Sequence, residues 1–314
     1  MSQVVSEFAS AEAQLKQSAK SKPSRRQSAK TEPSERRARY LSPFRYPGGK
    51  SWLVPYIKQW LARKDVGLFV EPFVGGGAIS LAVAYRQWAR HVVMCEVDPA
   101  VAAIWNAVLN GDADWLQKRI TSFKLTKKSL IEQLAGRGRE PRTLAFRTLL
   151  RNRTSHGGLL TQGSALLKKG ENGKGIQSRW YPQTLAARLT KIKTFRDKIT
   201  FVEGDGVQLL ESLSNAKKCF FFLDPPYTSG SISAGGRMYD HHLIDNARLF
   251  SLAKRMSGEF LMSYDDTREI RLMAKAHGFQ VRKVAMRTRH HVAAEELLVC
   301  RDFGWLSRAR LADA

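Results

Sequence analysis

Several kinds of segment are missing from this 314-residue chain, and each absence removes a class of protein. No run approaches the ~20 uncharged apolar residues of a transmembrane helix, so we expect no membrane partner. The first residues lack the basic-then-apolar order of a secretory signal. Cysteine is scarce, and each of the 3 thiols lies in an apolar run, which indicates reduced core cysteines and neither a disulfide framework nor a metal site. We therefore expect a cytoplasmic protein.

Acidic residues are also few compared with basic ones, and the imbalance is concentrated in one block. The chain has 52 Lys and Arg against 28 Asp and Glu, a formal net charge of +24. Residues 117–198 hold 20 basic and 4 acidic residues, so they carry 20 − 4 = +16 of that charge. A charge confined to one block is typical of a protein that binds a polyanion, and we predict nucleic acid as the partner. A solvated basic face without a partner is the alternative.

The order of apolar segments predicts an α/β fold. Residues 1–40 are rich in Ser, Lys, Arg and Pro and predict a disordered basic tail. From residue 66 onward, short apolar runs alternate with helical patterns, which is typical of a mostly parallel sheet covered by helices on both faces. Residues 117–198 interrupt the alternation as an insertion between 41–116 and 199–314. The predicted strands are 68–70, 91–98, 199–205, 219–224, 259–266, 279–287 and 296–303.

Chemically suggestive residues follow the first two strands, at the ends where open α/β sheets bind their ligands. Glu71–Gly77 contains three consecutive glycines that would let the backbone approach a ligand closely. The G-x-G-x-x-G dinucleotide fingerprint is not met, and a tight turn without function is the alternative. Glu96 closes the second strand, where a carboxylate can accept hydrogen bonds from ribose hydroxyls. Asp98 competes for that role, although before Pro99 it is more suited to cap the next helix.

A third group, Asp224-Pro225-Pro226-Tyr227, ends the apolar run 219–224. A proline pair cannot continue a central strand, so the chain leaves the sheet here with its φ angles fixed. The Asp224 carboxylate and the Pro225 carbonyl could then accept two N–H bonds from an exocyclic amine. Tyr227 would stack on the face of the same planar heterocycle. A capped turn with a packed tyrosine is the alternative.

These groups combine in a recognisable order with three further segments. With FRYPGGK (44–50), FVEPFVGGGAI (69–79), EGD (203–205), FLDPPY (222–227) and ELLV (296–299), the chain resembles Dam-type DNA adenine-N6 methyltransferases, the D12 class of the alpha group. The likeness extends over 41–303, and RNRTSHGGL (151–159) and RWYPQ (179–183) are similar too. It implies a Rossmann-like S-adenosyl-L-methionine-dependent methyltransferase fold with a mostly parallel seven-stranded sheet. The insertion would be a mainly helical target-recognition region that binds double-stranded DNA.

The resemblance also implies a role for individual residues. Methyl transfer would go directly to the N6 amine of a flipped adenine, without a metal, at the catalytic residues Asp224, Pro225, Pro226 and Tyr227. The expected contacts to S-adenosyl-L-methionine are Tyr46, Lys50, Glu71, Phe73, Gly75, Gly77, Glu96, Asp205 and Asp224. The expected contacts to DNA are Arg137, Arg139, Arg151, Arg153, Lys168, Lys169 and Arg179.

Other functions stay open at the level of sequence. Asp224 favours adenine over the cytosine-N4 enzymes, which commonly carry Ser at that place, but cytosine-N4 and RNA adenine methylation are alternatives, as is a catalytically silent DNA-binding relative. The loop TQGSALLKKGENGKG departs from the RYN-containing hairpin of the GATC-methylating members, so no recognition sequence is assigned. A restriction-modification, phage or housekeeping role is equally compatible with the chain. We expect a monomer or a weak dimer, associated with the nucleoid when on DNA.

Overall fold

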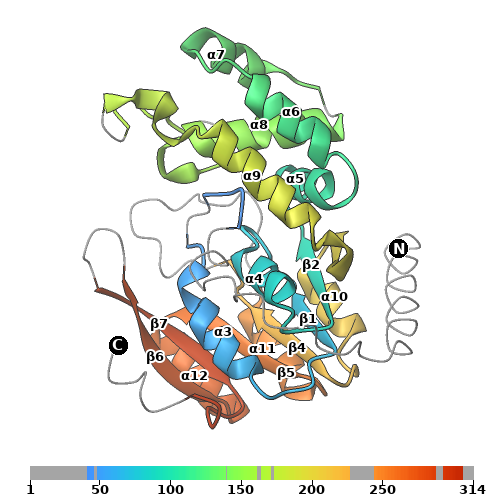
Figure 1. Ribbon diagram of the computed structural model, residues 1–314. Coiled ribbons are helices and arrows are strands. Elements are labelled where there is room, and N and C mark those ends of the chain that lie inside the picture. The colour runs from blue at the N-terminus through green and yellow to red at the C-terminus, as the bar shows by residue number, and fades with distance from the viewer. Residues whose placement is uncertain are drawn as a thin grey trace.

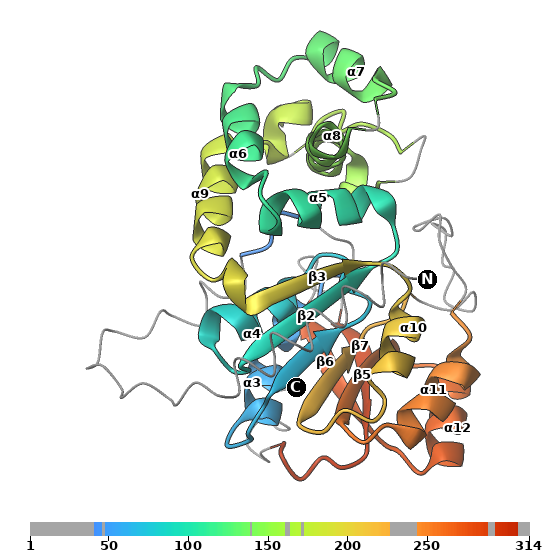
Figure 2. The same ribbon diagram turned by 90° about the vertical axis from the view of Figure 1, so that its right-hand side faces the viewer.

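A seven-stranded sheet forms the centre of the molecule (Figures 1 and 2). The computed structural model describes residues 41–45, 48–138, 140–160, 164–170, 173–226, 244–287 and 293–306. The strand order is β3-β2-β1-β4-β5-β7-β6, with β7 antiparallel to both neighbours and the other pairs parallel, which confirms the predicted fold class. The strands are β1 (Leu68–Glu71), β2 (His91–Glu96), β3 (Ile199–Glu203), β4 (Cys219–Leu223), β5 (Glu259–Asp265), β6 (Gln280–Arg287) and β7 (Ala293–Cys300).

The order of the strands reverses between β1 and β4. From β1 the chain builds outward through β2 to β3, and it then returns to add β4 and β5 on the other side of β1. The loops that leave β1 and β4 therefore diverge at the carboxyl edge of the sheet, and ligands of open α/β sheets bind in the crevice at such a point.

Helices cover both faces of the sheet (Figure 2). One face packs against the short 3-10 helix η1 (Ser51–Leu53) and against α3 (Val54–Leu61), α4 (Ala78–Arg86) and α5 (Pro99–Leu109). The opposite face packs against α10 (Gly206–Ser212), α11 (Asn246–Arg255) and α12 (Arg268–His277).

These two layers explain why β4 is apolar at every position. Phe220 and Phe222 belong to the core on the side of α3 and α4, whereas Phe221 and Leu223 belong to the core on the side of α10 and α11. A central parallel strand buried on both faces has no polar alternation. The run ends at Asp224, where the chain leaves the sheet at its carboxyl edge.

Two predicted strands end earlier in the structure because their last carboxylates cap helices. β2 stops at Glu96, since Asp98 Oδ1 accepts the Ala100 N–H at 2.8 Å and begins α5. β3 stops at Glu203, since Asp205 caps α10 in the same way. A side chain that accepts a backbone N–H at a helix start stabilises the helix by about 1 kcal/mol. β7 covers 293–300 instead of 296–303, because its pairing with β6 starts at Ala293.

The residues between α5 and β3 form a helical region that lies beyond β3 at one end of the molecule (Figure 2). Its helices are α6 (Ala113–Ser122), α7 (Lys127–Ala135), α8 (Pro141–Thr154) and α9 (Pro182–Lys193), with short 3-10 turns His156–Gly158, Gly175–Arg179 and Arg196–Lys198. The boundary expected at 117 lies inside α6. Apolar residues of α6, α8 and α9 join the core around α5, so the region packs directly on the sheet domain. Within the described ranges, no helix is long and apolar enough to cross a bilayer.

Candidate functional site

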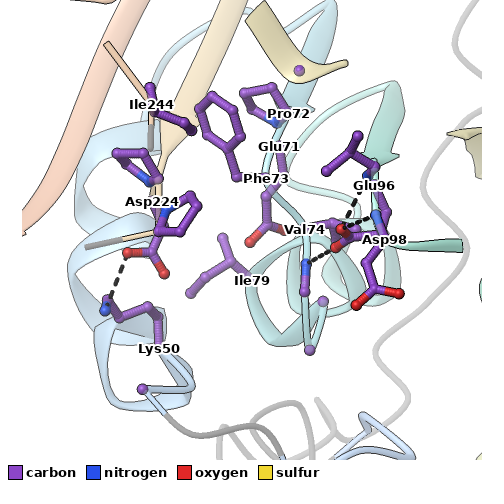
Figure 3. A pocket seen from close by; sticks show the side chains of 18 of the residues that line it. Lys50, Glu71, Pro72, Phe73, Val74, Ile79, Glu96, Asp98, Asp224 and Ile244 are labelled. Atoms are coloured by element: carbon purple, nitrogen blue, oxygen red, sulfur yellow. Dashed lines mark hydrogen bonds and ion pairs between the residues drawn. The ribbon is translucent and has the colours of Figure 1, made fainter. Parts of the chain in front are cut away.

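A cavity of about 460 Å³ lies at the carboxyl edge of the sheet, at the point where the strand order reverses (Figure 3). It brings together the residues that the sequence placed at separate strand ends. Its walls are Gly48–Lys50, Glu71–Ile79, Glu96–Asp98, Asp205–Val207, Asp224–Pro226, Ile244, Asp245 and Arg248. Lys50, Glu71, Phe73, Gly75, Gly77, Glu96, Asp205, Asp224, Pro225 and Pro226 were all predicted and all line it. Tyr46 and Tyr227 lie outside the described residues.

The glycine turn after β1 is held from several sides. Trp105 on α5 donates its ring N–H to the Gly75 carbonyl at 2.9 Å. Ser42 donates its hydroxyl to the Gly76 carbonyl at 2.5 Å. Gly77 has φ +61°, and a Cβ there would lie 2.6 Å from the Trp105 ring, so only glycine fits this position. The turn therefore presents backbone to the cavity at close range.

Glu96 stabilises the same turn from β2. One carboxylate oxygen accepts the Gly75 N–H at 2.9 Å, and the other accepts the N–H groups of Val97 at 3.0 Å and Asp98 at 2.9 Å. Burial raises the pKa of Glu96 to about 7, although these backbone bonds oppose the shift. A carboxylate offers about four acceptor positions, so the three bonds from described residues leave roughly one for a ligand hydroxyl. The sequence did not reveal that Glu96 also shapes the turn.

Glu71 is the most strongly perturbed acid at the cavity. Its carboxylate accepts the Ser80 N–H at 2.9 Å in the first turn of α4. Burial raises the pKa of Glu71 to about 8, and the nearby charges of Asp224 and Glu96 raise it further. A buried carboxyl beside other carboxyls holds its proton more tightly because the charged form is poorly solvated.

Asp224 is joined to a buried ion-pair network. The Lys50 ammonium lies 3.1 Å from Asp224 Oδ1 and 3.1 Å from Glu296 Oε1 on β7. Burial raises the pKa of Asp224 to about 6; Lys50 opposes this shift and Glu296 adds to it. Asp224 is 21% exposed and faces the cavity, whereas Lys50 is 4% exposed (Figure 3). Sequence reasoning missed Glu296, whose one signal was an acid at the start of the apolar run ELLV.

The charge of the cavity wall favours a cationic ligand. Even with Glu71 protonated, its carboxylates outnumber its cations: Glu96, Asp98, Asp205, Asp224 and Asp245 stand against Lys50 and Arg248. Arg248 is itself paired with Glu211 at 2.7 Å. Apolar side chains such as Phe73, Val74, Ile79 and Ile244 form the rest of the wall. Within the described part of the chain, no group of 3 or more His, Cys, Asp or Glu could hold a metal ion.

The residues expected to contact DNA differ in how far they are exposed. Arg137, Lys168 and Lys169 are exposed, Arg151 and Arg179 are half-buried, and Arg139 lies outside the described residues. Arg153 is a correction: it is 4% exposed and donates to the Pro43 carbonyl. Burial lowers its pKa to about 9. Arg153 holds the segment before the sheet against α8, so it is not available to a phosphate.

Comparison with known families identifies the protein class. The D12 class N6 adenine-specific DNA methyltransferase family matches residues 46–288. The chain is an S-adenosyl-L-methionine-dependent methyltransferase that acts on DNA. More particularly, it belongs to the D12 class N6 adenine-specific DNA methyltransferases.

Solved structures with a related arrangement are distant. An rRNA methyltransferase from Streptomyces viridochromogenes shares 14% identity over 87% of this chain and 87% of that chain, with a TM-score of 0.34. A precorrin-6y C5,15-methyltransferase from Geobacter metallireducens shares 10% identity over 78% of this chain and 85% of that chain, with a TM-score of 0.32. At such scores these likenesses carry no weight for function. A search of curated proteins finds no match.

Proposed function

We propose that this enzyme transfers a methyl group from S-adenosyl-L-methionine to the N6 amine of an adenine that has been rotated out of duplex DNA. One observation carries the proposal: Asp224 and the Pro225-Pro226 turn stand on the wall of the same cavity as Glu96 and the glycine turn. An acceptor for an amine and a binding site for a nucleoside-like cofactor therefore share one space.

The walls of the cavity suit the cofactor. When bound, S-adenosyl-L-methionine supplies an electrophilic methyl group on a sulfonium ion, and the excess of carboxylates is favourable to that charge. Glu71 and the glycine turn would line the methionine part, and Glu96 would accept one ribose hydroxyl. Asp205 Oδ1 accepts the Val207 N–H at 2.7 Å. Asp205 Oδ2 would then be the acceptor for the amine on the adenine ring of the cofactor. Lys50 is engaged by Asp224 and Glu296, so we assign it to the catalytic acid in place of the expected cofactor contact.

Asp224 would activate the target nitrogen. The lone pair of an adenine amine is delocalised into the ring, and N–H bonds accepted by the Asp224 carboxylate and the Pro225 carbonyl favour a more tetrahedral nitrogen. Positive charge develops on that nitrogen as the methyl group arrives, and a fixed carboxylate stabilises it. The methyl carbon would bond to nitrogen as its bond to sulfur breaks, the sulfonium would leave as a neutral thioether, and the methylated amine would then lose one proton to solvent, so no covalent enzyme intermediate is required.

The target base must leave the helix to reach Asp224. An amine within a base pair cannot enter a cavity at the edge of the sheet, and extrusion costs a few kcal/mol. The cationic helical region would hold the flanking duplex through its phosphates. Stacking of the extruded ring on Tyr227 stays a prediction outside the described residues.

The first test of this function identifies the methylated product. DNA and RNA are treated with the enzyme and labelled S-adenosyl-L-methionine and then digested, and we expect the methyl label in N6-methyladenine of the DNA. N4-methylcytosine, methylated RNA, or no transfer despite cofactor binding would each support one of the alternatives.

Asp224→Ala should reduce methyl transfer by at least about 10³-fold, because the amine loses its acceptor. Binding of cofactor and DNA should stay close to wild type. Asp65→Ala, which removes an exposed surface acid paired with Arg90 and Lys218, is the control and should keep full activity. Near-normal turnover of Asp224→Ala would overturn the mechanism.

A further inference from the structure

A buried relay of polar groups stands behind Asp224. Ser263 donates its hydroxyl to Glu296 Oε2 at 2.7 Å. Glu296 Oε1 lies 3.1 Å from the Lys50 ammonium, which in turn lies 3.1 Å from Asp224 Oδ1. Ser263 is fully buried, and Glu296 is 2% exposed. Ser263, Glu296 and Lys50 are therefore each held by the next group away from water, and the relay reaches the cavity at Asp224.

The antiparallel strand β7 brings the relay to the site. Glu296 pairs with Asp265 at the carboxyl end of β5, and β5 lies beside β4. Because β7 runs against its neighbour, a residue in its middle reaches the edge at which the parallel strands end. Lys50 comes from the segment before η1 and α3, and its ammonium points to Asp224 at the end of β4 (Figure 3).

Glu296 does not itself touch the cavity. It is absent from the cavity wall, whereas Lys50 and Asp224 both line it. If Asp224 were the one acid beside it, the Lys50 ammonium could rotate toward other acceptors. The second carboxylate, Glu296, restricts the ammonium to a position between the two acids. Two carboxylates and one ammonium also leave a net negative charge next to the position where the amine becomes positive. A buried acid is costly unless it is paired and hydrogen-bonded, and Glu296 has both kinds of partner.

We propose that Glu296 is a positioning residue for methyl transfer: it holds Lys50 on Asp224 Oδ1 and so fixes the catalytic carboxylate toward the amine. The proposal rests on the proposed role of Asp224. Glu296 acts through Lys50 and makes no contact with cofactor or base.

The charges around Asp224 determine how its pKa responds. Lys50 lowers the pKa of Asp224, while the negative charges of Glu296 and Asp265 raise it. Glu71, at the end of β1, is a further acid within electrostatic reach. Removing the charge of Glu296 while keeping its shape should therefore lower the pKa of Asp224. Since the ionised carboxylate is the active form, the acidic limb of kcat should move to lower pH.

Glu296→Gln in the full-length chain tests the charge, because Gln keeps an oxygen for Lys50. We expect the acidic limb of the kcat profile to shift to lower pH, with the Kd for S-adenosyl-L-methionine, measured by calorimetry, unchanged within about twofold. Glu295→Gln is the matched control: this exposed neighbour on β7 pairs with Lys283 and should leave the profile in place. An unshifted profile in Glu296→Gln would overturn the inference.

Glu296→Ala tests the anchoring of Lys50. We expect kcat to fall on the order of 10²-fold, because small displacements of a catalytic group cost that much, while cofactor affinity is kept. A kcat that stays near wild type would contradict anchoring, and if Glu296→Ala does not fold, Glu296→Gln decides alone. If Asp224→Ala is active, the proposed function itself is wrong. If Asp224→Ala is inactive but Glu296→Gln has the wild-type pH profile of kcat, only the inference about Glu296 is wrong.

Discussion

At the scale of single residues, three acids of the cavity, Glu71, Glu96 and Asp224, differ in their hydrogen-bond and charge partners. Glu71 receives one backbone N–H, Glu96 receives three, and Asp224 receives an ammonium. Burial raises the pKa of all three, to about 8, about 7 and about 6 respectively. The site is therefore poised around neutral pH, where small changes of charge alter which acid is ionised.

The raised pKa of Glu71 predicts how stability depends on pH. Its pKa is 4.5 in the unfolded reference and about 8 when folded, so between these values the folded chain binds more protons than the unfolded chain. Its contribution to stability is thus complete below pH ~4.5 and is lost as pH rises toward 8. Glu71→Gln, which can still accept the Ser80 N–H, should flatten this decline and stabilise the fold at pH 8.5 by roughly a few kcal/mol.

Urea unfolding at pH 5.5 and pH 8.5 measures that effect. The exposed Glu132→Gln on α7 is the control and should keep the wild-type difference between the two pH values. If Glu71→Gln keeps that difference as well, Glu71 is ionised in the folded protein and the assigned proton is wrong.

At the scale of elements, the glycine turn depends on α5 as much as on its own residues. Trp105 both donates to the Gly75 carbonyl and fills the space that a Cβ on Gly77 would need. The segment before the sheet adds a second support, since Arg188 donates to the Ser42 carbonyl at 2.7 Å and Ser42 donates to Gly76. Hydrogen bonds through Ser42 therefore connect the helical region to the glycine turn.

Gly77→Ala should disturb that turn more than its backbone strain alone would. The left-handed φ costs roughly 1–2 kcal/mol for a non-glycine residue, and the clash with Trp105 must also displace the turn or the ring. We expect at least a tenfold weaker Kd for S-adenosyl-L-methionine by calorimetry. Gly111 has φ +136°, but a Cβ there would have nothing within 4 Å. Gly111→Ala therefore introduces backbone strain without a clash and should bind S-adenosyl-L-methionine as the wild type does. Equal Kd values for the two variants would show that the contact with Trp105 does not shape the site.

At the scale of the whole molecule, negative and positive charge lie in different parts: the cavity of the sheet domain and the helical region. The cavity wall is acidic, whereas 117–198 carries 20 basic against 4 acidic residues and forms most of the helical region. This division suits a small cationic cofactor in one part and a long polyanion along the other.

The affinity for DNA should therefore fall steeply with salt. If about six phosphates are neutralised, the association constant drops on the order of 10³-fold between 50 and 200 mM salt. Replacing the exposed pair Lys168 and Lys169 by Gln should reduce the slope of log K against log salt by about two. Filter binding across a salt series measures it, with exposed Lys275→Gln on α12 as the control. A slope unchanged by the double substitution would remove this pair from the DNA interface.

Local patterns in the sequence determined the strands, the order of the motifs and the acids at the strand ends. They did so because apolar runs, proline pairs and glycine turns act on neighbouring residues. Tertiary structure alone decided the partners. Arg153 looked like a surface cation in RNRTSHGGL, yet on α8 it is buried and donates to the Pro43 carbonyl. Glu296 looked like one acid in a strand, yet the antiparallel course of β7 puts it beside Lys50. Such contacts join residues far apart in the chain, and long-range packing creates them, so no local pattern records them.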